Sequence, residues 1–468
     1  MSAGAFALDF ARIAELLPRY AIEGPRYTSY PTAPVWKESY GPEQFLAELG
    51  RTDVAPADGL SLYVHVPFCR SLCHFCACNK IITRDPELPA LYLDTVEHEI
   101  ESVRAALAVP RLATQQHWGG GTPTHLAPDE LRRLFHAVVS HFPMTADAEI
   151  SLEVDPRVTT AEHVAALREC GFNRISMGVQ DFDPDVQAAI HRIQPVAQTA
   201  ALVETARAAG FAGVNFDLIY GLPYQTEASF QRTLDRVLEL APDRLALYSY
   251  AHVTWVAKQQ RGFERKDLPP PEVKIRILLS AIRRLLSAGY RFIGLDHFAK
   301  PDDELSLALD GRSLRRNFMG YTTQAGVDLI GFGPSAISEL RGSYAQSHRE
   351  LDTWHQTVAE RGVATLRGHL LSQDDVERRW IISRIMCLGE VRAADYEAAF
   401  GRRFAAAYAR ELEALEPARR DGLIERAEDG SLAATPLGRL LVRNLAMAFD
   451  AYLPEQQRAG RPMFSRTV

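Results

Sequence analysis

The sequence predicts an α/β fold built around a parallel sheet, and three observations support this prediction. Short runs of β-forming residues alternate with amphipathic helical stretches through the middle of the chain, which is typical of βα units. Six such units follow one another, which indicates an incomplete (β/α)6 barrel of the TIM type, although an open doubly wound sheet would show the same periodicity. Polar residues follow several of the predicted strands at the edge where such folds collect their chemistry, and this favours the barrel.

The six strands are expected in chain order between residues 61 and 250. Their segments are LSLYVHV with its core at 61–66, QQHW (115–118), EISLEV (149–154), NRISMG (173–178), VNFDLIYG (214–221) and RLALYSY (244–250). Glu153, Gln180, Asp217 and Tyr250 sit at or just after the C-terminal ends of four of these strands. We therefore expect a ring of candidate functional side chains around one mouth of the barrel.

The flanking segments differ in pattern from the barrel. Residues 266–274 indicate a proline-rich break before another helix, and residues 290–298 can add a further strand. From about residue 365 the pattern is helical and resembles a small helical or winged-helix-like module. The predicted division is an N-terminal extension at 1–58, a catalytic barrel with its extension at 59–364, and a mostly helical C-terminal domain at 365–468.

Composition and charge favour an ordinary globular enzyme. The 468 residues are 47% hydrophobic and 24% charged, with a formal net charge of -7, so no overall basic field would attract nucleic acid or an anionic membrane. Asp9, Arg12 and Glu15 interrupt the apolar N-terminal stretch, which is unlike a secretory signal, and no later run is long enough to span a membrane. We expect a cytoplasmic protein without a nucleic-acid or membrane partner.

Four of the six cysteines cluster within ten residues, and this is the strongest chemical signal in the chain. Cys69, Cys73 and Cys76 form a C-x3-C-x2-C run directly after the first predicted strand, and Cys78 follows two residues later. A disulfide framework would spread its cysteines more evenly, and a structural zinc site usually combines two separated C-x2-4-C pairs. Clustered thiols in a reducing compartment indicate a metal.

Three thiolates on one loop can bind three irons of a four-iron cluster and leave the fourth iron open to a substrate. Two other interpretations of the cysteines are a compact zinc site and a group of free thiols. Cys78 could also serve as a fourth ligand, which would close the cluster and favour simple electron transfer.

At this point the sequence resembles the radical S-adenosylmethionine superfamily and, within it, the oxygen-independent coproporphyrinogen III oxidase (coproporphyrinogen dehydrogenase) family. The resemblance covers almost the whole chain. Its motifs are PRYTSYPTA (25–33), YVHVPFC (63–69), CACNK (76–80), HWGGGTPTHL (117–126), SLEVDPR (151–157), GFNRISMGVQDF (171–182), DLIYGLP (217–223), YAH (250–252), DHFA (296–299), RNFMGYTTQ (316–324) and FSR (464–466).

The resemblance implies a [4Fe-4S] cluster held by Cys69, Cys73 and Cys76, whereas Cys78 would be a catalytic residue that is not a ligand. It also implies S-adenosylmethionine as cofactor, with two molecules bound. The implied contacts of S-adenosylmethionine are Gly120, Gly121 and Thr122 at its methionyl end, the polar residues Glu153, Gln180, Arg192 and Asp217, and the apolar or aromatic residues Tyr63, Phe75, Ala251 and Ile337. For the apolar residues, ordinary core packing is the competing interpretation.

The implied reaction is the oxidative decarboxylation of two propionate side chains of coproporphyrinogen III to vinyl groups, which gives protoporphyrinogen IX in haem biosynthesis. The resemblance implies that a 5'-deoxyadenosyl radical starts it, and that a reductant protein such as flavodoxin or ferredoxin supplies the electron to a monomeric enzyme. Because the substrate is a polyanion, we expect arginines in its pocket, with Arg26, Arg315 and Arg316 as candidates. Residues 25–31 are a candidate lid over the barrel mouth.

A related binding protein is the alternative function. Shorter relatives of the family resemble haem chaperones, which keep the three cysteines but replace the residue at the position of Cys78 and carry a Tyr-Trp pair in the segment aligned with 316–321. This chain keeps Cys78 and lacks that pair, which favours the oxidase. A radical enzyme that modifies RNA would be expected to show a basic surface or an RNA-binding module.

Overall fold

The computed structural model describes residues 9–51, 53–55, 58–255, 257–458 and 464. The chain forms two compact units, the barrel unit at 36–284 and 326–370 and the C-terminal unit at 1–35, 285–325 and 371–468. These units do not follow the predicted division at residues 58 and 364, because the first 35 residues and a middle segment both join the C-terminal part of the chain. The predicted FSR motif reaches Ser465 and Arg466, which lie outside the described residues.

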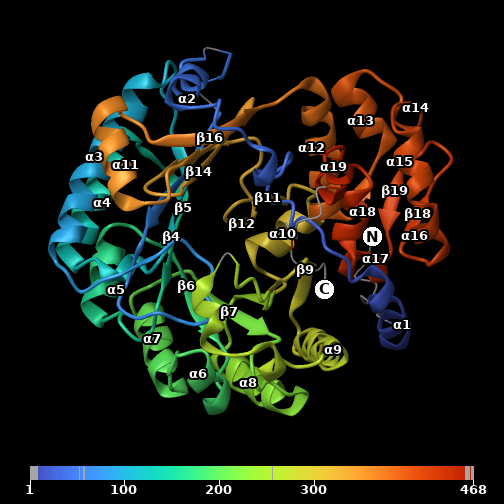
Figure 1. Ribbon diagram of the computed structural model, residues 1–468, viewed down its shortest axis with the longest axis horizontal. Helices are drawn as coiled ribbons and strands as arrows, with labels where there is room; N and C mark the ends of the chain where they lie inside the picture. Colours follow the sequence, from blue (N-terminus) through green and yellow to red (C-terminus); the bar gives the residue numbers. More distant parts are fainter. Residues whose placement is uncertain (1–8, 52, 56–57, 256, 459–463, 465–468) are drawn as a thin grey trace. The chain divides into compact units, whose positions relative to one another are not determined.

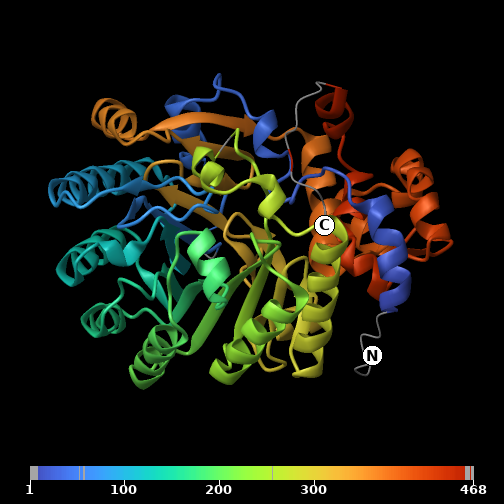
Figure 2. The same cartoon turned by 60° about the horizontal axis from the view of Figure 1, so that its bottom comes forward.

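Six parallel strands form the centre of the barrel unit (Figures 1 and 2). They are β1 (Leu60–Val66), β4 (Ala113–Gly120), β5 (Met144–Val154), β6 (Arg174–Gln180), β7 (Gly213–Tyr220) and β8 (Arg244–Ser249). Each strand pairs in parallel with the next one along the chain. All six predicted strands are therefore confirmed. The sequential order excludes a doubly wound sheet, in which the strand order reverses in the middle, and confirms the incomplete barrel.

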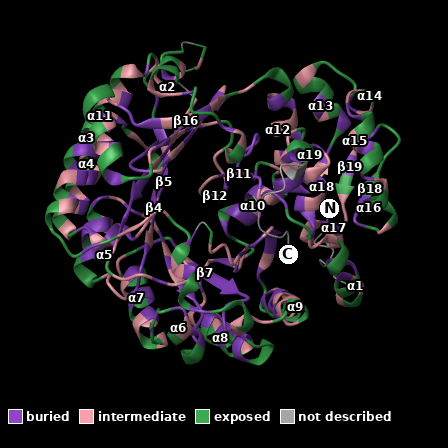
Figure 3. Ribbon diagram, viewed as in Figure 1, coloured by how far each residue is buried: buried purple, intermediate pink, exposed green. Residues whose placement is uncertain are grey.

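Helices connect these strands and cover the outside of the sheet (Figure 2). They are α3 (Glu87–Ala106), α4 (Pro128–His141), α5 (Ala161–Glu169), α6 (Pro184–Ala189), α7 (Val196–Ala208) and α8 (Glu227–Leu240), and α9 (Pro271–Ser287) begins after the predicted proline-rich break. Side-chain caps fix several helix starts, as where Thr226 Oγ1 accepts a hydrogen bond from the Ser229 amide at 3.1 Å. The strands are buried while the helices turn exposed faces outward, as Figure 3 shows, which explains the near-continuous hydrophobic runs of the strands.

The sheet continues on the other side of β1 through strands that the sequence pattern did not predict. β13 (Asp328–Phe332) pairs in parallel with β1, and β14 (Ile337–Leu340), β15 (Ser343–Ser347) and β16 (Thr365–Leu370) follow in antiparallel order. The helix α11 (Leu351–Arg361) lies between the last two strands in sequence. The predicted start of helical structure at residue 365 is wrong, because residues 365–370 form the edge strand β16 by pairing with β15.

The C-terminal unit is mostly helical, as predicted. Its helices include α1 (Phe10–Tyr20), α10 (Glu304–Asp310), α12 (Gln373–Leu388), α13 (Ala393–Phe400), α15 (Ala409–Ala414) and α18 (Val442–Met447). Three short strands, β17 (Glu390–Val391), β18 (Ile424–Arg426) and β19 (Leu432–Ala434), form a small antiparallel sheet. The further strand predicted at 290–298 is a hairpin of β9 (Arg291–Gly294) and β10 (His297–Ala299).

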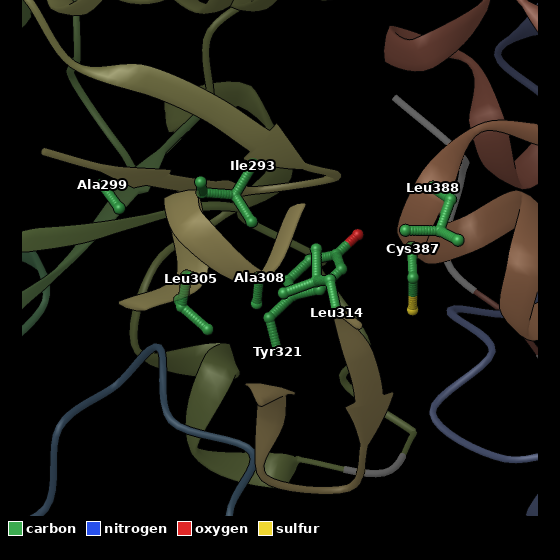
Figure 4. Packing of buried hydrophobic residues seen from close by; sticks show 8 residues of the cluster. All are labelled: Ile293, Ala299, Leu305, Ala308, Leu314, Tyr321, Cys387 and Leu388. Carbon is green, nitrogen blue, oxygen red and sulfur yellow. The ribbon is translucent and has the colours of Figure 1, made fainter. Parts of the chain in front are cut away.

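The N-terminal segment is built into the C-terminal unit. Arg19 pairs with Asp421 at 2.6 Å, the Tyr27 hydroxyl donates to Asp450 at 3.0 Å, and Arg443 Nε donates to the Pro25 carbonyl at 2.9 Å. One apolar cluster of this unit joins β9, α10 and the end of α12, and it includes Ile293, Ala308, Leu314, Tyr321, Cys387 and Leu388 (Figure 4). No helix in the described part of the chain is both long and apolar enough to cross a membrane.

Candidate active site

A cavity of about 450 Å³ opens at the C-terminal ends of the six parallel strands, and most of the predicted site residues line it. They are Cys69, Cys73, Phe75, Cys76, Cys78, Gly120, Gly121, Thr122, Glu153, Gln180, Arg192, Asp217 and Ala251. The volume lies within the range of about 300–1,000 Å³ that is typical of small-molecule and cofactor pockets. The lining residues come from the C-terminal ends of the barrel strands and from the loops that follow all six of them.

The cysteine loop is held by backbone hydrogen bonds to several parts of the barrel unit. The Thr83 amide donates to the Cys69 carbonyl at 3.1 Å, and the His74 amide donates to the Ile190 carbonyl at 2.9 Å. Gln260 Nε2 donates to the Phe75 carbonyl at 2.9 Å. The loop is therefore fixed at both ends and in its middle, although it contains no helix and only the two-residue strand β2 (Phe68–Cys69).

The thiols of the three predicted ligands differ in their surroundings. Cys73 is buried, and Cys69 and Cys76 are half-buried. Burial raises the pKa of Cys69 to about 11, although a hydrogen bond with Thr122 Oγ1 at 3.5 Å acts in the opposite direction. A hydrogen bond from Cys78, which is exposed, lowers the pKa of Cys76. Cys78 is thus the neighbour of a predicted ligand.

The donor set fits a cluster better than a single ion. Within the described residues, no group of three His, Cys, Asp or Glu side chains converges as the ligands of one metal ion do. A four-iron cluster takes each thiolate on a different iron, so its ligands need not converge on one point. Cys69, Cys73 and Cys76 line one cavity and can each bind a different iron, so they fit a four-iron cluster.

Two arginines approach the sulfur of Cys73, and one carboxylate holds both of them. Arg157 Nη2 lies 3.4 Å from Cys73 Sγ, and Arg192 Nη1 lies 3.7 Å from it. Asp155 pairs with Arg157 at 2.6 Å and with Arg192 at 3.2 Å. Burial alone would raise the pKa of Asp155, but the positive charges of Arg192 and Arg157 outweigh burial and lower it. Asp155 is therefore ionised and fixes both guanidinium groups beside the cysteine loop.

Arg192 lines the cavity, but protein acceptors already engage its donors. Besides Asp155, its Nη2 donates to the Gly178 carbonyl at 2.6 Å and its Nε donates to Gln194 Oε1 at 3.1 Å. The prediction that Arg192 contacts S-adenosylmethionine therefore competes with a role in this network. Sequence reasoning missed Asp155 and Arg157, although their position directly after β5, beside Glu153, is a signal that could have indicated them.

The glycine run after β4 lies against the backbone of the cysteine loop. A Cβ on Gly121 would come within 2.6 Å of the Phe68 carbonyl oxygen, so only glycine fits there. Gly120 has a φ of +110°, and its amide lies 3.3 Å from Glu153 Oε2 as a hydrogen-bond donor. Gly120 and Gly121, called the glycine cradle below, place backbone atoms on the cavity wall, where a ligand could approach them closely.

Two carboxyl groups and an amide face the cavity from three neighbouring strands. Burial, followed by the negative charge of Glu153, raises the pKa of Asp217 to about 7. Asp217 accepts hydrogen bonds from Asn215 at 3.0 Å and from Ser176 at 3.3 Å, and Glu153 lies 3.7 Å from His117 Nε2. Gln180 ends β6 with a φ of +66°, an uncommon conformation for a residue that is not glycine.

Tyr63 and Ile337 do not line the cavity. The Tyr63 hydroxyl lies 3.1 Å from His65 Nδ1, and its ring stacks on His117, so Tyr63 supports the side chains beneath the site. Ile337 is in β14, where its backbone packs against Gly331. The lining also includes His125, Tyr248 and Tyr250, of which only Tyr250 was marked by its place after a predicted strand.

Comparisons with known proteins agree with this geometry. The family model described as the radical SAM superfamily matches residues 63–237, and the one described as the HemN C-terminal domain matches residues 371–441. An oxygen-independent coproporphyrinogen III oxidase of Escherichia coli (strain K12) is 47% identical over 453 residues, which cover 97% of this chain and 98% of that protein. A protein of the same name from Synechocystis is 42% identical over 461 residues, with 97% and 98% covered.

The solved structure of coproporphyrinogen III oxidase (HemN) from Escherichia coli, described as a radical SAM enzyme, matches with a TM-score of 0.88. The identity is 45%, and the match covers 91% of this chain and 97% of that chain. Such identity over nearly full lengths, together with the barrel and its cysteine loop, establishes that this chain belongs to the oxygen-independent coproporphyrinogen III oxidase family of the radical SAM superfamily.

Proposed function

We propose that this protein catalyses the oxygen-independent oxidative decarboxylation of coproporphyrinogen III to protoporphyrinogen IX, a step of haem biosynthesis. Two propionate side chains become vinyl groups. The observation that carries the proposal is the loop of Cys69, Cys73 and Cys76 on the wall of a cavity at the C-terminal ends of the barrel strands. Enzymes of this fold type place their catalytic groups at that edge.

Membership in the radical SAM superfamily implies a [4Fe-4S] cluster and S-adenosylmethionine. When bound, these two groups would supply the 5'-deoxyadenosyl radical, which would remove a hydrogen atom from the β-carbon of the propionate side chain before carbon dioxide and one further electron leave. Cys69, Cys73 and Cys76 hold the cluster. Thr122 lies beside Cys69, and Asp155 fixes Arg157 and Arg192 beside Cys73. These contacts orient the loop, and the two arginines add positive charge near the sulfur of Cys73.

S-Adenosylmethionine binds in the same cavity. The glycine cradle of Gly120 and Gly121 offers backbone atoms to its methionyl end, and Glu153 and Asp217 can accept hydrogen bonds from its amino group or ribose hydroxyls. Gln180 can both donate and accept. Phe75 and Ala251 add apolar surface. Two molecules bind, as the family resemblance implies.

Radical SAM enzymes need a reductant, and we propose flavodoxin or ferredoxin for this one. The enzyme acts as a monomer in the cytoplasm. All six cysteines in the structure are free thiols, which suits a reducing compartment.

The test is anaerobic reconstitution with iron and sulfide, followed by incubation with coproporphyrinogen III, S-adenosylmethionine and a chemical reductant. Chromatography then measures porphyrin products and 5'-deoxyadenosine. We expect vinyl products together with 5'-deoxyadenosine. 5'-Deoxyadenosine without decarboxylation would indicate a different substrate, and stoichiometric haem binding without either product would indicate a chaperone.

Cys78 is assigned a catalytic role separate from cluster binding, because it is exposed and neighbours Cys76. We expect Cys78→Ala to retain iron and the cluster absorption while forming fewer vinyl products. Loss of iron comparable to that in Cys76→Ala would instead make Cys78 a ligand.

A further inference from the structure

Among the described residues, three arginines of the C-terminal unit form no ion pair with an acidic side chain. Arg315 and Arg316 belong to β11 (Arg315–Asn317), which pairs in antiparallel register with β12 (Gly320–Thr322), and Arg384 lies on α12, which packs against β11. Arg315 Nη1 donates to the Leu314 carbonyl at 2.9 Å, and the Arg384 guanidinium stacks over Trp380 at 4.9 Å. None of these contacts neutralises a charge.

Arg316 is the most unusual of the three. Its Nε and Nη1 are both shielded from solvent, and neither has a hydrogen-bond acceptor within the described parts of the chain. Its guanidinium carbon lies 4.9 Å from the centre of the Tyr321 ring, which stands directly opposite on β12. Buried donors without acceptors cost free energy, and a carboxylate that reached the half-buried Arg316 side chain would offset that cost.

The apolar cluster shown in Figure 4 forms one wall of this arginine group, because Tyr321 and Cys387 belong to it. Burial raises the pKa of Cys387 to about 11, and the positive charges of Arg316, Arg315 and Arg384 act in the opposite direction. The charges of all three arginines therefore act on the same thiol, that of Cys387. Burial, followed by the positive charge of Arg315, lowers the pKa of Arg384, and the negative charge of Asp395 acts in the opposite direction.

Three acidic side chains of the same unit form ion pairs with other arginines. Asp296 forms an ion pair with Arg26, and Asp395 and Glu390 both pair with Arg312. The group of Arg315, Arg316 and Arg384 therefore carries excess positive charge beside an apolar surface. A ligand that complements it has a carboxylate attached to an apolar body.

We infer that Arg316, supported by Arg315 and Arg384, binds a propionate carboxylate of the substrate. This inference rests on the proposed function, because coproporphyrinogen III is a tetracarboxylate on an apolar ring. It narrows the three arginines expected from sequence, because Arg26 is occupied by Asp296 and is not part of this group.

The test measures binding of coproporphyrin III, the stable oxidised form of the substrate, by fluorescence quenching with the reconstituted enzyme. We expect Arg316→Met to weaken binding at least about tenfold, because a charge-assisted hydrogen bond is lost. Arg316→Lys keeps the charge without the planar fork and should be intermediate. Arg410→Met is the matched control, since Arg410 is an exposed arginine of the same unit, and it should bind as the wild type does.

The tetramethyl ester of coproporphyrin III keeps the ring but has no carboxylates, so comparing it with the acid separates recognition of the carboxylates from affinity for the ring. The wild type should bind the ester more weakly than the acid, and Arg316→Met should show a smaller preference for the acid. Wild-type affinity of both Arg316 variants for the acid would overturn the inference, as would an equal loss of affinity for acid and ester. If wild type binds coproporphyrin III through Arg316 but forms no vinyl product, the proposed function fails while the carboxylate site stands.

Discussion

Cys73 is the one cysteine of the loop whose sulfur meets two guanidinium groups, those of Arg157 and Arg192. Hydrogen bonds and positive charge near a cluster sulfur stabilise the reduced, more negative state. Asp155 offsets part of that charge, but its main effect is to hold both arginines in place. With Cys73 as a ligand of the proposed cluster, these contacts would adjust how easily the cluster accepts an electron.

Replacing Arg157 by Met should therefore make the cluster's midpoint potential more negative. The measurement is a redox titration followed by electron paramagnetic resonance. Arg157→Lys, which keeps the charge, should shift the potential less than Arg157→Met does. Equal potentials for wild type and Arg157→Met would show that this arginine does not act on the cluster.

Asp217 predicts a pH dependence of cofactor binding. Its folded pKa of about 7 lies above its ordinary value, so the carboxyl is mostly protonated at pH 6 and ionised at pH 8. Because the ionised form is the stronger acceptor, the affinity for S-adenosylmethionine should rise as the pH increases through about 7. Calorimetric titration across this range checks the expectation. In Asp217→Asn, the affinity for S-adenosylmethionine should no longer rise with pH. The same rise in this variant as in the wild type would show that Asp217 does not bind S-adenosylmethionine.

The same pKa shift has the opposite sign for folding. A carboxyl whose pKa is raised in the folded state favours folding while it is protonated, and that contribution is lost as the pH rises from about 4 to about 7. Cofactor binding and fold stability therefore respond to Asp217 in opposite directions as the pH increases.

The sequence allowed prediction of Glu153, Gln180 and Asp217 as cavity residues because each ends a recognisable strand. Asp155 and Arg157 were not assigned because charged residues after a strand are as often solvated as functional. Their role depends on Arg192 and Cys73, which are distant in sequence and meet only in the folded chain. Their position after β5 is a local signal, but the contacts that give it a meaning are not recorded in the local sequence.

At the scale of elements, the glycine run and the cysteine loop form one unit. The Gly121 amide donates to the Val66 carbonyl and the Thr122 amide to the Phe68 carbonyl, each at 2.8 Å. The turn after β4 is thus tied to the strand end that carries Cys69, and its close approach explains why glycine is needed.

Gly121→Ala should disrupt this contact. The added methyl group meets backbone atoms that cannot move independently, and overpacking of this kind costs about 1–3 kcal/mol. We expect a lower unfolding temperature and less iron bound after reconstitution. Gly41→Ala is the control, because Gly41 has a negative φ and the nearest atom to its new Cβ is 3.7 Å away. Equal stability and iron content in the two variants would contradict the tight contact.

The strands β13 to β16 could not be predicted from the sequence, and the physical reason is the same for all four. β13 to β16 are short, and the chain between β13 and β14 contains glycine and proline. The alternation of apolar and polar residues that indicates a strand therefore does not repeat often enough to be recognised. The pairing of β13 with β1 joins segments about 270 residues apart, which a local pattern does not record. The six barrel strands, by contrast, each follow a helix in a regular alternation.

At the scale of the whole molecule, residues 9–35 fold together with the C-terminal part of the chain. The predicted N-terminal extension is divided, because residues 1–35 belong to the C-terminal unit and the following residues belong to the barrel unit. Residues 25–31 donate and accept hydrogen bonds within the C-terminal unit, so deletion of this segment would damage that unit whether or not it acts as a lid.

Hydrogen exchange tests this arrangement. Amides of residues 12–20 in α1 should be protected together with those of α12 and α18. Tyr27→Phe should increase exchange in the N-terminal segment and in these two helices, because Asp450 loses a buried hydrogen-bond partner. Rapid exchange of residues 12–20 in the wild type, with α12 and α18 still protected, would show that the N-terminal segment does not belong to the unit.

The central claim is that the thiols of this cavity support radical cleavage of S-adenosylmethionine. Its most direct test is the yield of 5'-deoxyadenosine from reconstituted, reduced Cys69→Ala. Cys170→Ala provides the matched control, because Cys170 is a buried thiol that does not line the cavity. We predict that Cys69→Ala forms no 5'-deoxyadenosine while Cys170→Ala forms it as wild type does. Continued cleavage of S-adenosylmethionine by Cys69→Ala would contradict the claim.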